Sequence, residues 1–168
     1  SLQSQEIKAD AQNALSFTES YLENPADFAK GRKEPLQGNE VRLILWTASF
    51  EIGKQHPFGL GLGGLEPALA QKLVQWAYPK QAEKEFNPHN QWLQIWNEIG
   101  WLGLGIFGFL LSALTLHFYQ NRNLAALLLT FVFLIFCLFE SILQRESGVV
   151  FFLCWLTALS FMTKRTTS

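Results

Sequence analysis

Hydrophobic and polar positions divide the chain into a polar first part and an apolar second part. Up to about residue 97, apolar side chains are interspersed with charged ones. Three apolar runs follow, over about 101–118, 124–143 and 148–162. A helix needs about 20 predominantly apolar residues to cross a bilayer. The first two runs reach about this length, and the third requires local thinning of the bilayer. We therefore expect three transmembrane helices.

The polar part also has the periodicity of helices. One apolar face recurs at helical spacing through Val41, Leu45, Ala48 and Ile52. Gly53 and Pro57 then break the pattern, which predicts a helix over residues 39–55. Further helices are expected over about 5–22 and 66–77, with an exposed linker at 31–38 and a charged connector at 78–86. The predicted fold class is all-α.

The stretch between the two parts is polar and begins with Asn87-Pro88-His89-Asn90. Asn87 is a suitable N-cap, and Pro88 suits the first helical position. His89 would then lie in the first turn, where the helix dipole disfavours a second positive charge. We expect a neutral imidazole near pH 7, which is the form that a general base requires. This helix should continue into the first apolar run.

Charge is as unevenly placed as hydropathy. Charged residues make up 16% of the chain, against about 25% in an ordinary globular domain. Residues 1–97 carry nine Lys or Arg and eleven Asp or Glu, whereas residues 98–168 carry four and three. The net charge of −1 and the absence of a basic block interleaved with aromatic residues argue against a nucleic-acid partner. Cys137 and Cys154 lie in apolar runs and are interpreted as packing residues.

The basic residues of the apolar part predict its orientation. Arg122 lies between the first two runs, and Lys164 and Arg165 follow the third. Positive residues favour the cytoplasmic side, so residues 1–97 should lie outside and the C-terminal tail inside. Because no signal peptide or initiating Met precedes a polar region of this size, we expect the sequence to be the C-terminal part of a longer polytopic membrane protein.

Arg42 stands inside an otherwise apolar helix, and two interpretations remain open. Its side chain either snorkels to water or pairs with Glu40 or Glu51, or it is held rigidly on the helix to bind an anion.

Glu140 and Arg145 pose a similar choice at the outer end of the second apolar run. Ionisable groups near hydrocarbon face a cavity or pair with each other. They form either a structural pair that fixes the turn or the mouth of an active site shared with Arg42 and His89.

Several familiar motifs are absent or incomplete. Gly59-Leu60-Gly61-Leu62-Gly63-Gly64 contains the pattern G-x-G-x-x-G, but no strand precedes it, so a dinucleotide site is not expected. A turn whose amides line a phosphate remains open. His56, His89 and His117 have no metal-ligand spacing, and no nucleophile elbow is present. We expect neither a metal nor a cofactor.

A family resemblance rests on three segments that occur in order. They are Arg42-Leu43-Ile44-Leu45-Trp46, His56-Pro57-Phe58-Gly59-Leu60-Gly61-Leu62-Gly63, and His89-Asn90-Gln91-Trp92-Leu93 continuing to Glu98-Ile99-Gly100-Trp101-Leu102-Gly103. Together they resemble the C-terminal half of the O-antigen ligase and O-antigen polymerase superfamily of bacterial membrane glycosyltransferases. The segment from Phe139 to Phe152 resembles the same group, so the resemblance covers about residues 39–155.

The resemblance implies an enzyme that moves a glycan from an undecaprenyl-diphosphate carrier to an acceptor hydroxyl at the periplasmic face of the inner membrane, without a metal ion. The acceptor is the lipid A core in ligases, another lipid-linked glycan in polymerases, and a protein hydroxyl in other relatives. Residues 1–97 would form a large periplasmic loop. A second functional arginine of the ligases lies upstream of this sequence, so the site would be complete only in the full-length protein.

By position, the resemblance gives His89 the role of the histidine that deprotonates the acceptor and Arg42 that of the arginine that engages the donor diphosphate. Asn90, Glu140, Arg145 and His56 are supporting candidates. The chemistry agrees, because arginine binds phosphate oxygens bidentately and a neutral histidine can accept a proton.

Two other classes of function compete with the enzyme. One is a non-catalytic membrane protein whose outer loop binds a partner or a glycan. The other is a transporter, which the scarcity of polar groups in the apolar runs disfavours.

Overall fold

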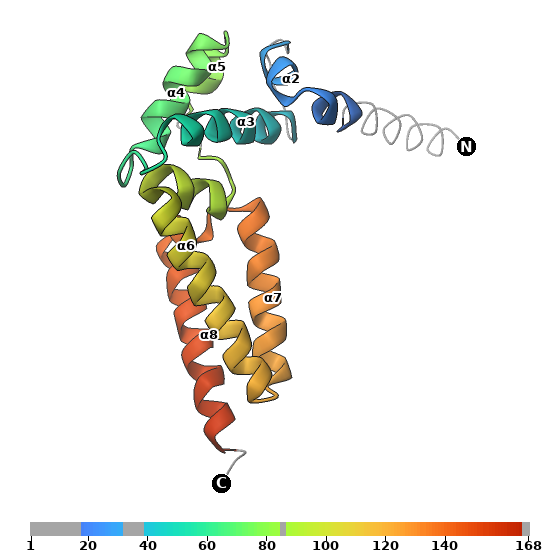
Figure 1. The fold of residues 1–168 in the computed structure, drawn as a ribbon, viewed down its shortest axis with the longest axis vertical. Helices are drawn as coiled ribbons and strands as arrows, with labels where there is room; N and C mark the ends of the chain where they lie inside the picture. Colours follow the sequence, from blue (N-terminus) through green and yellow to red (C-terminus); the bar gives the residue numbers. More distant parts are fainter. Residues whose placement is uncertain (1–17, 32–38, 85–86, 166–168) are drawn as a thin grey trace, which may run out of the picture.

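The computed structural model describes residues 18–31, 39–84 and 87–165, and these residues form helices and connecting turns without a strand (Figure 1). Residues 18–23 are helical. The elements that follow are α2 (Pro25–Gly31), α3 (Asn39–Gln55), α4 (Leu65–Gln75), α5 (Pro79–Ala82), α6 (Gln91–Gln120), α7 (Leu124–Phe139), the 3-10 turn η1 (Ile142–Gln144) and α8 (Glu146–Arg165). The all-α prediction is confirmed for the described residues.

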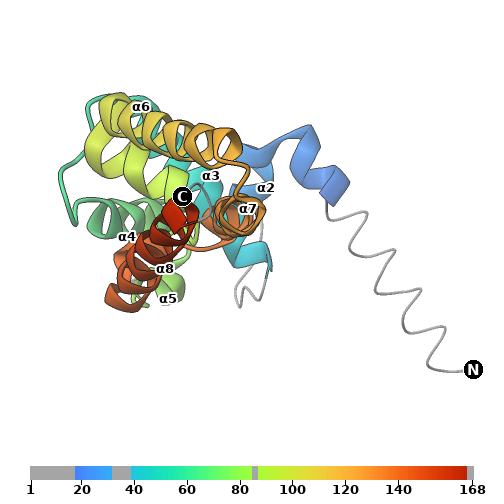
Figure 2. The ribbon, with the colours of Figure 1, turned by 90° about the horizontal axis from the view of Figure 1, so that it is seen from below.

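The helices form two parts that meet at the start of α6. The long helices α6, α7 and α8 run side by side, and α3 lies across their upper end at a steep angle (Figure 1). Seen from below, α7 is viewed nearly end-on and α3 runs behind it (Figure 2). α3 packs against α2, α4 and α6, while α6 packs against α7. The turn between α6 and α7 and the C-terminal end of α8 lie at the same lower end (Figure 1).

A single apolar core holds the upper part together. It consists of buried residues from α2, α3 and α4 together with Trp76 and Tyr78. Tyr78 is completely buried, and its hydroxyl donates a hydrogen bond to the carbonyl of Ala29. The predicted charged connector at 78–86 is therefore wrong at its start, because the aromatic ring of Tyr78 completes the core and α5 follows it.

The prediction for residues 39–55 is confirmed by α3. α4 covers most of the predicted 66–77 and ends two residues earlier. Of the helix predicted over 5–22, the described part, from residue 18, is helical. Of the predicted linker, Gly31 belongs to α2, and 32–38 lies outside the described residues.

The predicted start of α6 is wrong by three residues. Asn90, not Asn87, is the N-cap, and its side-chain oxygen accepts a hydrogen bond of 3.0 Å from the amide of Leu93. His89 precedes the helix with a φ of +46°, in the left-handed region. The histidine therefore does not lie in the first turn, and the dipole argument based on that position does not apply.

Gly100 interrupts α6 nine residues after it begins. Its φ of 77° and ψ of −165° are not helical, so nearby backbone groups need other partners. The glycine-rich loop supplies them. The amide of Leu60 donates to the carbonyl of Asn97 (2.7 Å), and the carbonyl of Pro57 accepts from Trp101 (3.0 Å). A Cβ on Gly100 would come within 2.5 Å of the Phe58 backbone. The G-x-G-x-x-G motif thus has a structural role here.

The helices of the apolar part differ in length from the predicted apolar runs. Among the described residues, α6 is the one helix long and apolar enough to cross a membrane, and α7 and residues 146–158 of α8 are apolar but shorter. α7 ends at Phe139 rather than at the predicted residue 143, because Glu140 adopts an extended conformation and η1 follows. The exposed surface of these helices is rich in Leu, Phe, Val and Ile. A helix that is apolar all round requires lipid or protein around it.

Candidate functional site

The loop 87–90, which precedes α6, is attached to α3 on one side and to η1 on the other. The indole nitrogen of Trp46 in α3 donates a hydrogen bond of 2.7 Å to the carbonyl of Pro88. The side-chain amide of Asn87 donates to the Oε1 atom of Gln144 at 3.1 Å. Both partners are distant in sequence, by 42 positions for Trp46 and by 57 for Gln144, and they fix this short loop.

Asn90 and Gln91 add contacts to the connection between α7 and α8. The backbone amide of Asn90 donates to the hydroxyl of Ser141 (3.2 Å), and its side-chain amide donates to the carbonyl of Leu138 (3.0 Å). The side-chain oxygen of Gln91 accepts from the amide of Leu143 (2.8 Å). Asn90, Gln91 and Ser141 are buried, so these polar groups depend on one another for hydrogen bonds. The loop is consequently a fixed platform for His89.

The imidazole of His89 faces the carboxylate of Glu140. Its Nδ1 atom lies 3.1 Å from Oε1 and 3.3 Å from Oε2 of Glu140. An ionised carboxylate can only accept hydrogen bonds, so this contact places the proton of a neutral imidazole on Nδ1. The Nε2 lone pair is then free, and no other described residue forms a hydrogen bond with Nε2. The geometry suits a group that accepts a proton from a neighbouring molecule.

The backbone of His89 is held in place as firmly as its ring. Its amide donates a hydrogen bond of 2.9 Å to the side-chain oxygen of Asn87. A positive φ is uncommon outside glycine, although histidine adopts it more readily than most residues. Asn87 therefore has a positioning role here instead of the predicted role of N-cap.

Glu140 also contacts Arg145, as one of the two sequence interpretations proposed. The Nη2 atom of Arg145 lies 3.9 Å from Oε1 of Glu140. The side chain of Arg145 is 70% exposed, whereas that of Glu140 is 30% exposed. An exposed ion pair of this length contributes little to stability. The closer contact of Glu140 is with His89, so Glu140 contacts both residues, and the shared active site stays a prediction.

Arg42 lies on α3, one helical turn before Trp46, and residues four apart share a helix face. It is therefore on the side of α3 that contacts the loop 87–90. Its side chain is half-buried, and it forms no hydrogen bond or ion pair with another described residue. The proposed pairing with Glu51 is not found, because Glu51 pairs with Lys72 at 2.7 Å.

His56 is not brought to this group of residues. It follows the last residue of α3 and is exposed. Fourteen residues separate it from Arg42, which corresponds to about 20 Å along a helix. The structure therefore assembles His89, Asn90, Glu140 and Arg145, with Arg42 one turn from Trp46, and leaves His56 at the far end of α3. No pattern in the sequence marked Trp46, Gln91 or Ser141 as positioning residues.

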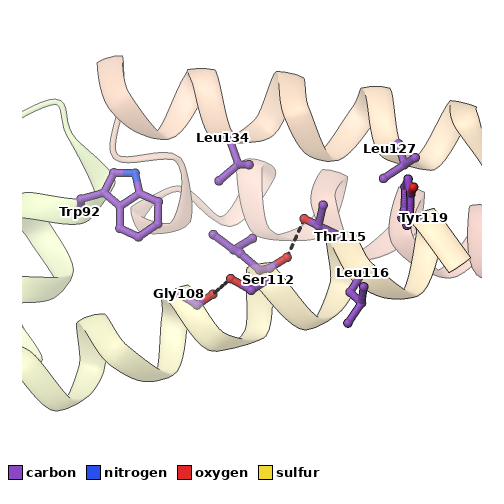
Figure 3. A pocket seen from close by; sticks show the side chains of 9 residues that line it. Trp92, Gly108, Ser112, Thr115, Leu116, Tyr119, Leu127 and Leu134 are labelled. Carbon is purple, nitrogen blue, oxygen red and sulfur yellow. Dashed lines mark hydrogen bonds between the residues drawn. The ribbon is translucent and has the colours of Figure 1, made fainter.

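Two apolar cavities lie lower, between the long helices. A groove of about 450 Å³ between α6 and α7 begins at Trp92 and ends near Tyr119 (Figure 3). The hydroxyls of Ser112 and Thr115 face their own helix and donate to carbonyls one turn earlier, at 2.7 Å each (Figure 3). A second cavity of about 370 Å³ lies between α6 and α8. Neither cavity is lined by Arg42 or His89. In the described ranges, no three His, Cys, Asp or Glu side chains form a group that could hold a metal ion.

Comparison with known families agrees with the resemblance described above. The sequence model of the O-antigen ligase family matches residues 7–108. The chain belongs to the O-antigen ligase family. The matched residues include Arg42, Trp46 and the loop 87–90, while Glu140 and Arg145 lie beyond them. None of the curated proteins and none of the solved structures matches the chain.

Membership in this family has consequences for function. The O-antigen ligase family consists of bacterial membrane proteins. Its activity is glycan transfer of the O-antigen ligase and polymerase type, in the context of lipid-linked glycans and membrane lipids. The apolar surface of α6, α7 and α8 fits such an environment.

Proposed function

We propose that this chain forms part of a ligase-like glycosyltransferase that moves a glycan from undecaprenyl diphosphate to an acceptor hydroxyl, with the lipid A core as acceptor. The reaction takes place at the periplasmic face of the inner membrane, where residues 1–97 lie, and residues 98–168 supply three membrane helices. The observation that carries the proposal is the contact between His89 Nδ1 and Glu140, which leaves Nε2 available. A membrane protein that only bound a glycan would not need an oriented imidazole.

His89 is the general base in this proposal. Nε2 accepts the proton of the acceptor hydroxyl as its oxygen attacks the anomeric carbon of the donor glycan. The bond between that carbon and the diphosphate oxygen breaks, and the diphosphate leaves with the bonding electrons. Glu140 stabilises the imidazolium that forms and keeps the ring in place. A positioned general base contributes a factor of typically about 10² to 10⁴ in rate.

Arg42 binds the diphosphate. The leaving group develops negative charge, and a guanidinium can stabilise it bidentately at any physiological pH. Support comes from the position of Arg42 one turn from Trp46, whose indole contacts Pro88, and from the lack of a described partner for its side chain. No metal ion takes part in this mechanism, because the arginine supplies the positive charge.

The test is glycan transfer by the full-length protein in liposomes that contain the lipid-linked donor and a lipid A core acceptor. His89→Ala should lower the turnover rate about 10² to 10⁴-fold and leave donor binding and membrane insertion unchanged. His117→Ala is the matched control, because this histidine lies exposed in the last turn of α6. A wild-type rate in His89→Ala would remove His89 as the general base, and the absence of transfer by the wild-type protein would favour the non-catalytic class.

Arg42 variants separate the second role from the first. Arg42→Ala should raise the donor KM, and Arg42→Lys should restore binding only in part because the planar fork is lost. Unchanged donor dependence in both variants would remove Arg42 from the site. EDTA should leave the rate unchanged. A loss that a divalent ion reverses would contradict the metal-free mechanism.

A further inference from the structure

The glycine-rich loop 57–64 exposes two large apolar side chains. Phe58 is 92% exposed and Leu62 is 83% exposed, more than the other large apolar residues described. The loop contains no charged residue. Single exposed apolar side chains are ordinary on a protein surface, but a group on one short loop indicates a contact surface.

Five of the seven backbone amides of this loop donate hydrogen bonds within the protein, and those of Phe58 and Leu62 do not. Three amides donate to backbone carbonyls outside the loop: Gly59 to His56 (2.9 Å), Leu60 to Asn97 (2.7 Å) and Gly61 to Glu98 (3.0 Å). The amide of Gly64 donates to the carbonyl of Gly61 (3.0 Å), and that of Gly63 to the carboxylate of Glu98 (3.1 Å). A loop in water has no need of so many internal partners, because water satisfies its amides. Near hydrocarbon an unsatisfied amide is costly, so the two remaining amides require the polar head groups at the membrane boundary.

The loop also lies at the level where α6 becomes apolar. The carbonyl of Pro57 accepts a hydrogen bond from the amide of Trp101, the first residue of the apolar run. Trp101 is 58% exposed and lies 4.9 Å from the ring of Trp96, which lies 5.4 Å from that of Phe50. Aromatic residues of this kind concentrate at the boundary between membrane and water. The loop is therefore joined to α6 where its apolar run begins.

We propose that the loop 57–64 inserts Phe58 and Leu62 into the outer leaflet, at the boundary between lipid head groups and acyl chains. Lys54 agrees with this placement, because its ammonium lies 4.8 Å from the Phe50 ring at the exposed end of α3 and can reach the head groups. The loop contacts one end of the segment 91–99, and the loop 87–90 precedes the other end. Anchoring the first loop in lipid thus fixes the height of His89 above the acyl chains. The inference rests on the proposed membrane placement of α6 and not on the catalytic role of His89.

Spin labels measure the depth of the loop directly. Nitroxide labels are attached to Phe58→Cys and to Leu62→Cys in the full-length protein, with Cys137 and Cys154 replaced by alanine, in phosphatidylethanolamine and phosphatidylglycerol vesicles. Glu83→Cys, exposed just after α5, is the control. Oxygen dissolves in lipid and a nickel chelate stays in water. Labels at 58 and 62 should collide more with oxygen and less with nickel than the label at 83.

Two outcomes would overturn the proposal. Nickel collisions at 58 and 62 as frequent as at 83 would place the loop in water. Exclusion of both reagents would show that another protein segment covers the loop. The labels report depth and not transfer, so the two proposals can fail separately. If the loop is exposed to lipid and His89→Ala has the wild-type transfer rate, the catalytic role of His89 is overturned and this inference stands.

Discussion

The two ends of the segment 91–99 are held in different ways. At its start, side chains hold the loop 87–90, through the indole of Trp46 and the amide groups of Asn87 and Asn90. At its end, backbone groups hold the break at Gly100, through the amide of Leu60 and the carbonyl of Pro57. One end thus depends on particular polar side chains, and the other depends on a close approach of two backbones.

This difference corresponds to what each end presents. Side-chain hydrogen bonds fix directions closely, which is what an imidazole with a defined free nitrogen requires. Backbone pairing leaves the side chains of the loop 57–64 free, so Phe58 and Leu62 can face outward while the amides of Gly59, Leu60 and Gly61 keep their partners. Loss of a side-chain donor should therefore disturb the first end, whereas only a change at a glycine should disturb the second.

The largest effect on stability is expected at the break. In Gly100→Ala, the new Cβ would come within 2.5 Å of the Phe58 backbone at a φ of +77°. The positive φ alone costs roughly 1–2 kcal/mol, and the clash adds to it, for a total of about 3 kcal/mol or more. Thermal unfolding of the full-length protein in detergent measures the loss.

Gly61→Ala is the control for this substitution. Gly61 has a φ of +87°, and a Cβ there would meet nothing within 4 Å. It should lose only the roughly 1–2 kcal/mol that belongs to the positive φ. Equal destabilisation of the two variants would show that the close approach of the backbones at Gly100 is not what holds the break.

A smaller effect is expected at the cap of α6. Asn90→Ala removes the acceptor for Leu93 and the donor to Leu138, and should destabilise the protein by about 1–3 kcal/mol. Asn90→Asp keeps the cap acceptor and removes the donor, so its Tm should lie between those of Asn90→Ala and the wild type. A wild-type Tm for Asn90→Ala would contradict the role assigned to these side chains.

The smallest effect on stability is expected at Trp46. Trp46→Phe keeps an aromatic ring but removes the donor to Pro88, a loss of about 0.5–1.5 kcal/mol. Because the loop 87–90 carries His89, the turnover rate should fall while the donor KM changes little. Trp155→Phe, at an exposed position of α8, should leave the rate unchanged. A fall in rate of the same size in both variants would remove Trp46 as a positioning residue.

Local sequence signals predicted the helices of the polar part. Val41, Leu45, Ala48 and Ile52 gave the face of α3, and Gly53 and Pro57 gave its approximate end, because these signals act within one or two turns. The start of α6 was missed because both Asn87 and Asn90 have the side chain of a good cap. Contacts of Asn90 with Leu138 and Ser141, distant in sequence, decide between the two.

Some residues of the candidate site could be selected from the sequence, but their geometry could not. Family order pointed to Arg42 and His89, and the charge of Glu140 near an apolar run marked it as a residue to explain. The contact between His89 and Glu140 joins residues 51 positions apart, and no local rule gives such a pairing. Likewise, the G-x-G-x-x-G pattern does not reveal that its amides donate hydrogen bonds to the carbonyls that precede the break at Gly100.

The central claim is that Nε2 of His89 takes the proton of the acceptor, and His89→Gly in the full-length protein tests it most directly. Glycine is the appropriate replacement because it accommodates the φ of +46° at this position. Transfer from the lipid-linked donor is measured with and without added imidazole. Without imidazole, the rate of His89→Gly should be at least about 10²-fold below that of the wild type. Added imidazole should raise the rate of His89→Gly and should not raise that of Arg42→Ala. A wild-type rate in His89→Gly without imidazole would contradict the central claim.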